Sequence, residues 1–290
     1  SRYDFHLICR AESPLAEEGI IMEKAPKYLQ IFVVVYLVFL YAPALLLPVF
    51  AFNDSTIISF PLSNFTFDWF LGLRNESALH DALGNSLLVA LSSAILSTCL
   101  GVLASRASAR HEFFAKKSII SFLLLPLVLP EIIIAVSLLV VLSQMGFALS
   151  LWTVVLGHTL VCMPFSIAIL TSAFNNMDQS LEEASFDLGE TGWGTFRRVI
   201  LPLVAPGIVS SLLITFTLSL DEFIIAFFLT GTGATLPVYI WGQLRFPNKL
   251  PNVMALGLLL LLFSLLLLSV GEYFRRRTKQ MAGTDSFTGD

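Results

Sequence analysis

The chain has 290 residues, of which 56% are hydrophobic and only 13% are charged. A soluble domain carries about a quarter charged residues, so this composition indicates an integral membrane protein and argues against a soluble enzyme. The formal net charge of −4 gives no support for a nucleic-acid-binding protein. The three cysteines lie far apart in the sequence, which argues against a disulfide framework or a CxxC metal site.

Six runs of apolar residues are each long enough to cross a membrane, which takes about 20 residues. These runs are 28–52, 83–105, 118–142, 151–174, 200–229 and 252–270. The sequence lacks the alternating pattern of membrane strands, so we expect helices. The sequence therefore predicts an all-α integral membrane protein with six transmembrane helices.

The distribution of positive charge predicts the orientation of these helices. With six crossings both termini lie on one side, and 14 of the 17 Lys and Arg residues fall on that side. The positive-inside rule then predicts that both termini are cytoplasmic. We expect an N-terminal tail over 1–27, a membrane domain over 28–275 and a C-terminal tail over 276–290. Because Met22 is a plausible native start, we expect 1–21 to be an upstream extension or poorly ordered.

The segment 178–206, between the fourth and fifth predicted helices, is too patterned for a simple connection. Ser180 and Glu183 fit a capping box, which predicts that a helix begins there. Gly189 then predicts the end of this helix, and a second short helix or turn follows. Pro202 falls in the first turn of the fifth predicted span, where proline is tolerated. The sequence predicts a short cytoplasmic helix of the kind that lies in a groove on a partner.

This segment resembles the EAA loop of binding-protein-dependent ABC importer permeases. That loop reads Glu-Ala-Ala, three residues, Gly, nine residues, then Ile-x-Leu-Pro. The corresponding residues here are Glu183, Ala184, Ser185, Gly189, Val199, Leu201 and Pro202. Serine replaces the second alanine and valine replaces the isoleucine. The resemblance implies that this coupling helix, between helices four and five, binds a cytoplasmic ATPase.

Further stretches resemble the spermidine/putrescine group of these permeases. They are "LPEIIIAVSLL", "TLSLDEFIIAFFLTG", "TLPVYIWGQLR" and "PNVMALGLLLL". The resemblance covers roughly residues 28–277. It implies a permease subunit of a bacterial inner-membrane ABC importer for a polyamine, working by alternating access. The implied partners are two ATPase subunits, a second similar permease subunit and a periplasmic binding protein.

The sequence has no G-x-x-x-x-G-K-[ST] motif and no Gly-Lys dipeptide. We therefore expect that the chain binds no ATP and is not itself an enzyme, so that a partner hydrolyses ATP. We expect no other cofactor and no bound metal. His158 and Cys162 stand four residues apart, but without a second pair we expect a hydrogen-bonded interior histidine.

Three acidic residues fall inside predicted helices, in the half of the membrane that we expect to face outward: Glu131, Asp221 and Glu222. A carboxylate at membrane depth usually faces the bundle interior or a water-filled path, so all three are candidates for a substrate pathway. Neighbouring residues of a regular helix point about 100° apart. We therefore expect that only one of Asp221 and Glu222 faces the pathway, and that the other faces a neighbouring helix. Tyr239 and Trp241 are further candidates, because an aromatic ring can stack on an ammonium group.

Other interpretations of these residues stay open. The acidic pair can be interfacial or held in a structural hydrogen bond, and Glu131 can cap the helix that restarts after Pro130. Tyr239 and Trp241 can belong to an interfacial aromatic belt. Other functions also stay open: a related importer for ferric iron, an aminophosphonate or an opine, a cation-coupled secondary transporter, or a purely structural membrane subunit.

Overall fold

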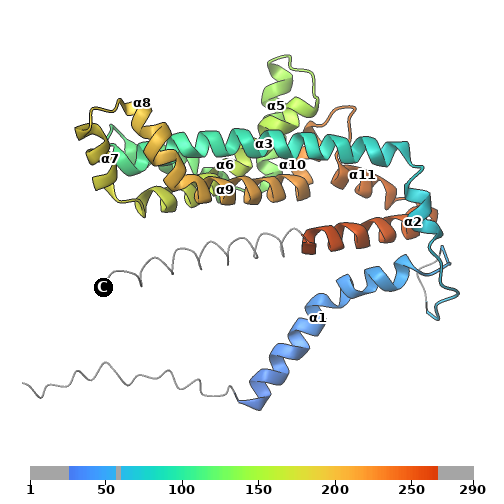
Figure 1. Cartoon of the computed structure of the whole chain (residues 1–290). Helices are drawn as coiled ribbons and strands as arrows, with labels where there is room; N and C mark the ends of the chain where they lie inside the picture. Colours follow the sequence, from blue (N-terminus) through green and yellow to red (C-terminus); the bar gives the residue numbers. More distant parts are fainter. Residues whose placement is uncertain (1–25, 57–59, 267–290) are drawn as a thin grey trace, which may run out of the picture.

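The computed structural model describes residues 26–56 and 60–266, and the regular structure in these ranges is helical (Figure 1). Three helices form the centre: α3 (Ser77–Arg110), α6 (Leu151–Asn175) and α9 (Leu201–Asp221). All three pack against one another along much of their length. The other elements are arranged around this bundle and at its two ends.

Glycines allow the central helices to approach closely. A Cβ atom on Gly101 of α3 would lie 2.0 Å from Ser166 Oγ of α6, and one on Gly207 of α9 would lie 2.7 Å from Ala173 Cβ. Both separations are too short for a real Cβ contact, so only glycine fits at either position. Small residues at helix contacts are the usual means of close packing in membranes.

Hydroxyl groups link the same three helices. Ser211 on α9 donates to Ser166 on α6 at 2.8 Å and lies 3.1 Å from the hydroxyl oxygen of Thr98 on α3. Ser105 and Ser93 of α3 donate to backbone carbonyls of α6. Such interhelical bonds stabilise a membrane bundle by about 0.6 to 2 kcal/mol each.

One end of the bundle is built by α1 (Lys27–Ala51), α2 (Asp68–Leu73), α11 (Leu236–Gln243), η3 (Pro247–Lys249) and the helix that continues to Leu266. Their buried apolar residues share one cluster with Leu79 of α3. The opposite end carries α7 (Gln179–Asp187), α8 (Gly192–Thr195) and the π-helical turn η2 (Phe196–Ile200). There Phe174 of α6 packs with Ile200 and Val204.

The remaining elements are α4 (Lys116–Leu123), η1 (Leu125–Leu127), α5 (Glu131–Gln144) and α10 (Ile224–Leu229). α10 packs against α5 and α6, and η1 also packs against α6.

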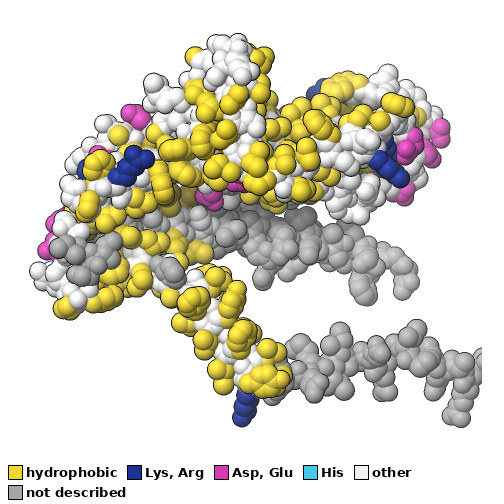
Figure 2. Space-filling model, turned by 180° about the vertical axis from the view of Figure 1, so that it is seen from behind, with side chains coloured by type: hydrophobic (Ala, Val, Ile, Leu, Met, Phe, Trp, Pro, Cys, Tyr) yellow, Lys and Arg dark blue, Asp and Glu magenta, His cyan; other side chains and the backbone are white. Residues whose placement is uncertain are grey.

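Figure 2 shows hydrophobic side chains over the middle of the molecule and charged side chains gathered mainly toward its ends. This distribution suits a bundle surrounded by lipid.

Among residues 26–56 and 60–266, four helices are long and apolar enough to cross a membrane: Ser77–Arg110, Leu151–Asn175, Gly192–Asp221 and Pro247–Leu266. α1 is a fifth if its two parts, which are bent by 46° around residue 43, are taken together. These five correspond to predicted spans, although residues 267–270 of the last prediction lie outside the described ranges. The predicted tails also lie outside them, except for residues 26 and 27.

Two predicted spans differ from the structure. The span 118–142 is not one helix: α4, η1 and α5 follow one another, and α5 alone, with 14 residues, is about 21 Å long. A helix that restarts after Pro130 was among the interpretations left open, since proline often interrupts a helix, and α5 does begin at Glu131. The prediction of a continuous helix over 200–229 is wrong. This helix ends at Asp221 and a new one begins at Ile224.

Candidate functional site

The break between α9 and α10 separates the two adjacent acidic residues. The backbone of Glu222 is extended, with φ −72° and ψ 125°, so the helix cannot continue through it. The Glu222 carboxylate instead accepts hydrogen bonds from the N–H groups of Ile225 at 2.9 Å and Ala226 at 3.2 Å. A carboxylate in this position satisfies free N–H groups of the first turn of α10. Glu222 is therefore the residue that starts the second helix.

His158 of α6 holds both sides of this break. Its Nε2 atom lies 3.1 Å from Glu222 Oε2, and its Nδ1 atom lies 2.7 Å from the hydroxyl oxygen of Ser219, in the last turn of α9. The imidazole is 1% exposed and the Glu222 side chain 8% exposed. The ring therefore shares a hydrogen bond with Ser219 and lies within ion-pair distance of Glu222. The expectation of a hydrogen-bonded interior histidine is confirmed.

Cys162, one turn further along α6, lies apart from this arrangement. Its thiol lies 3.7 Å from the Thr215 carbonyl oxygen. Within residues 26–56 and 60–266, no three His, Cys, Asp or Glu side chains form a group that could hold a metal ion.

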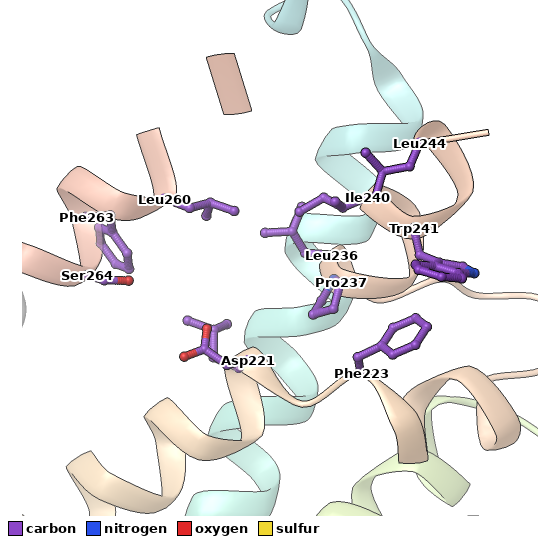
Figure 3. A pocket seen from close by; sticks show the side chains of 11 residues that line it. Asp221, Phe223, Leu236, Pro237, Ile240, Trp241, Leu244, Leu260, Phe263 and Ser264 are labelled. Atoms are coloured by element: carbon purple, nitrogen blue, oxygen red, sulfur yellow. The ribbon is translucent and has the colours of Figure 1, made fainter. Parts of the chain in front are cut away.

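Asp221 points the other way, into a cavity of about 280 Å³ (Figure 3). The cavity lies between the end of α9, α11 and the helix that contains Phe263 and Ser264. Of the described residues that line it, Asp221 is the only charged one. The rings of Phe223 and Trp241 form another part of the wall, with their centroids 5.4 Å apart. The cavity thus combines one carboxylate with aromatic and apolar walls.

The structure separates the five residues expected in a substrate pathway. Asp221 and Trp241 share the cavity, whereas Glu222 faces His158 on α6. Tyr239 lines a different, much smaller pocket beside the ion pair of Lys249 and Glu76. Glu131 is exposed in the first turn of α5, directly after Pro130.

Phe223 was not singled out from the sequence. It stands next to the acidic pair in an apolar run, where an aromatic residue is unremarkable. The ring of Phe223 faces Trp241 because the helix breaks at Glu222. The sequence around Glu222 contains no proline or glycine that would predict this break.

A short helix, α7, lies where the coupling helix was predicted, although it begins differently from the prediction. Its N-cap is Asp178, whose carboxylate accepts from the Ser180 N–H at 2.9 Å. The predicted capping box of Ser180 and Glu183 is therefore wrong, because the closer acid already satisfies that turn. The pKa of Asp178 is below its usual value, chiefly because the Ser180 backbone N–H donates to its carboxylate. The Ser180 side chain and the nearby positive charge of Arg110 lower this pKa further.

The predicted end of α7 at Gly189 is confirmed. Gly189 has a φ of +85°, and its N–H donates to the Phe186 carbonyl. The next N–H, of Glu190, donates to the Ser185 carbonyl, which completes a Schellman motif. The positive φ explains why this position needs glycine.

The residues that match the EAA motif have different surroundings. Glu183, Ala184, Leu201 and Pro202 are exposed. Ser185 is buried, and its hydroxyl lies 3.0 Å from that of Thr195 on α8. The serine that replaces the second alanine of the motif therefore joins α7 to α8.

Glu182 was missed in the sequence. Its carboxylate lies 3.1 Å from an Nη atom of Arg106 and 3.4 Å from Nε of Arg110, both at the end of α3. The sequence does contain a signal for this contact, because Arg106 and Arg110 stand four residues apart and can face the same acidic partner. In the sequence analysis these arginines contribute only to the charge count that predicts orientation.

Comparison with known proteins identifies the family. Residues 97–280 match the family described as "Binding-protein-dependent transport system inner membrane component". The chain belongs to this family. The resemblance drawn from the EAA loop is thereby confirmed.

Two curated members from Escherichia coli (strain K12) are similar over most of the chain. The spermidine/putrescine transport system permease protein PotC is 32% identical over 247 residues, which cover 84% of this chain and 93% of PotC. The putrescine transport system permease protein PotI is 33% identical over 231 residues, which cover 77% of this chain and 82% of PotI. The chain is thus a permease homologue with nearly the full length of these relatives.

Solved structures agree with this fold. The chain matches one from a bacterial ABC transporter involved in the import of the acidic polysaccharide alginate, with a TM-score of 0.68 and 19% identity. The match covers 87% of this chain and 94% of the other. A chain of the MetNI methionine ABC transporter matches with a TM-score of 0.54 and 19% identity. At this identity, these matches show the permease fold alone.

Proposed function

We propose that the chain is a permease subunit that carries a polyamine, such as putrescine or spermidine, across the inner membrane into the cytoplasm. The observation that carries this proposal is the cavity of Asp221. A polyamine has ammonium groups joined by short hydrocarbon chains. A carboxylate can pair with an ammonium group, and apolar walls suit the hydrocarbon. The polyamine permeases PotC and PotI are both similar to the chain over most of its length.

Phe223 and Trp241 add a second kind of attraction to the same cavity. A cation over an aromatic face gains about 0.5 to 2 kcal/mol, depending on how far it is desolvated. In our proposal Asp221 meets the ammonium group, and these rings and Tyr239 line its route. Glu131 receives the cation further along, and Glu222 keeps α10 in position.

We also propose the arrangement of the chain in the membrane. α1, α3, α6, the helix Gly192–Asp221 and the helix Pro247–Leu266 make five crossings, and α4, η1 and α5 together make the sixth. Both termini are then cytoplasmic. α7 and α8 lie on the cytoplasmic side, and α11 lies toward the outer side.

The outer face of α7 is the proposed docking site for a cytoplasmic ATPase. Glu183 is exposed there, and the neighbouring Leu188 and Trp193 are 87% and 71% exposed. Exposed apolar residues beside a charge are typical of a surface that a partner covers. In the assembled importer, two ATPase subunits bind ATP, a second permease subunit completes the pathway, and a periplasmic protein delivers the substrate. This chain itself needs no cofactor.

The test is reconstitution of the complete importer in proteoliposomes, with the binding protein, the second permease and the ATPase from neighbouring genes. We expect ATP-dependent uptake of radiolabelled putrescine or spermidine. ATP-dependent uptake of ferric iron, an aminophosphonate or an opine, without polyamine uptake, would contradict the proposed substrate. Uptake that follows a proton gradient without ATP would instead indicate a secondary transporter.

A further inference from the structure

Glu182 lies on the side of α7 that faces the bundle. Its side chain is 12% exposed, and the side chains of its partners Arg106 and Arg110 are 22% and 14% exposed. One carboxylate thus receives two guanidinium groups away from most of the solvent. Charged pairs with so little exposure are weakly screened by salt and solvent. We call these three residues the arginine–glutamate cluster.

The two arginines also contact the other central helices. An Nη atom of Arg110 lies 3.0 Å from the Met177 carbonyl oxygen and 3.4 Å from the Phe174 carbonyl oxygen, at the end of α6. The guanidinium carbon of Arg106 lies 4.8 Å from the centroid of the Phe196 ring, in the turn that leads into α9. Through two side chains of α3, Glu182 of α7 is therefore connected to α3, α6 and α9.

Glu183, the next residue, has the opposite surroundings. It is exposed, and its carboxylate accepts a hydrogen bond from Gln179 of the same helix at 3.1 Å. α7 therefore has one face directed outward and another attached to the bundle through charge. A displacement applied to the outer face acts on Arg106 and Arg110 through Glu182.

We propose that Glu182, Arg106 and Arg110 are positioning residues that transmit movement of α7 to the transmembrane bundle. The arginine–glutamate cluster then determines how much transport results from each ATP hydrolysed by the partner. This inference rests on the proposed function as an ATP-driven importer. It concerns the inner face of α7, whereas the EAA resemblance concerns the residue that meets the ATPase.

The decisive variant is Glu182→Gln, which removes the charge and keeps the shape. Putrescine uptake and ATP hydrolysis are measured in the same proteoliposomes that contain the complete importer. We expect stimulated ATP hydrolysis to persist while uptake per ATP falls about tenfold, within the range typical of coupling between two sites. Glu182→Asp keeps the charge, so it should recover part of this loss.

Glu190→Gln is the matched control. It breaks the ion pair of Glu190 with Arg198, whose side chain is 73% exposed, in the same loop. We expect this variant to keep the wild-type uptake per ATP, because exposed pairs contribute little.

Wild-type uptake per ATP in Glu182→Gln would overturn the inference, as would an equal loss in Glu190→Gln. A parallel fall of uptake, ATP hydrolysis and melting temperature would also overturn it, because the cluster would then act only in folding. These outcomes all require a wild-type importer that carries putrescine. Failure of the wild-type complex to do so would instead contradict the proposed function.

Discussion

The imidazole of His158 lies 3.1 Å from the carboxylate of Glu222, at the point where α9 ends and α10 begins. The same ring reaches Ser219 on the other side of the break. Through His158, α6 therefore holds the end of α9 and the start of α10 in their relative positions. This arrangement also sets the direction in which the Asp221 side chain points. Four predictions follow from the site and one from the packing of the helices.

His158→Ala should destabilise the complex and reduce uptake. Glu222 would keep its backbone hydrogen bonds but lose its buried side-chain partner, at a cost of about 1 to 3 kcal/mol. Thermal unfolding of the purified complex measures this loss. His80→Ala, which removes an exposed histidine of α3, is the control and should change little. If His158→Ala melted at the wild-type temperature, the imidazole would not stabilise the junction between α9 and α10.

Asp221→Asn should lower putrescine uptake while the complex still assembles. The variant removes a charged hydrogen bond to the ammonium group, worth about 1.5 to 3 kcal/mol, so the loss should be tenfold or more. Initial uptake rates at low putrescine concentration measure it. Asp54→Asn changes an exposed acidic residue of the connection after α1 and should transport normally. Unchanged uptake kinetics in Asp221→Asn would remove Asp221 from the pathway.

Glu183→Arg should uncouple the partner ATPase while the protein remains inserted in the membrane. The side chain is exposed, so the substitution should alter stability by only about 0.5 kcal/mol. Reversing its charge should repel the group that it meets on the ATPase. ATP hydrolysis stimulated by the loaded binding protein is the measurement, and full stimulation in the variant would contradict the coupling assignment.

The start of α7 should depend on pH through Asp178. The pKa of this carboxyl group is lower in the folded chain than in the unfolded one, chiefly because the Ser180 N–H donates to it. Its stabilising contribution is therefore complete above the ordinary value of about 3.9 and is lost as the pH falls through the lower, folded value. Hydrogen exchange of the first turn of α7 should increase in that acidic range. In Asp178→Asn this pH dependence should vanish, and its persistence would point to another group.

Gly157→Ala should separate α10 from α6. A Cβ atom there would lie 2.4 Å from Ile225 Cγ2 and 2.9 Å from Leu229 Cδ1. Overpacking of this kind costs about 1 to 3 kcal/mol, which a lower melting temperature would reveal. Gly84→Ala is the control, because nothing lies within 4 Å of the added atom. Equal melting temperatures of the two variants would contradict the tight contact.

Local signals in the sequence predicted much of the fold. Long apolar runs predicted the helices that are long and apolar enough to cross a membrane, and Pro130 indicated where α5 begins. Gly189 indicated the end of α7, because its φ of +85° is a conformation that glycine adopts readily. Each of these features depends on residues close together in the chain.

The rest of the site depends on contacts between distant segments. At the break, Glu222 and Ser219 both contact His158, which stands 64 positions before Glu222 in the sequence. Likewise, Glu182 could not be told from Glu183 without the arginines of α3, since adjacent residues of α7 face different directions. The sequence could therefore predict that only one of Asp221 and Glu222 faces the cavity side, but not which one, and it did not single out Glu182.

The length of α9 has a mechanical consequence. Leu201–Asp221 is one helix of 21 residues and is therefore about 32 Å long. One end follows η2, next to α7 and α8, and the other carries the carboxylate of the cavity. A helix of this length acts as a lever: a tilt of about 7° around its first turn displaces the far end by about 4 Å. A small rotation at the end near α7 is thus enough to move Asp221 by more than the length of a hydrogen bond.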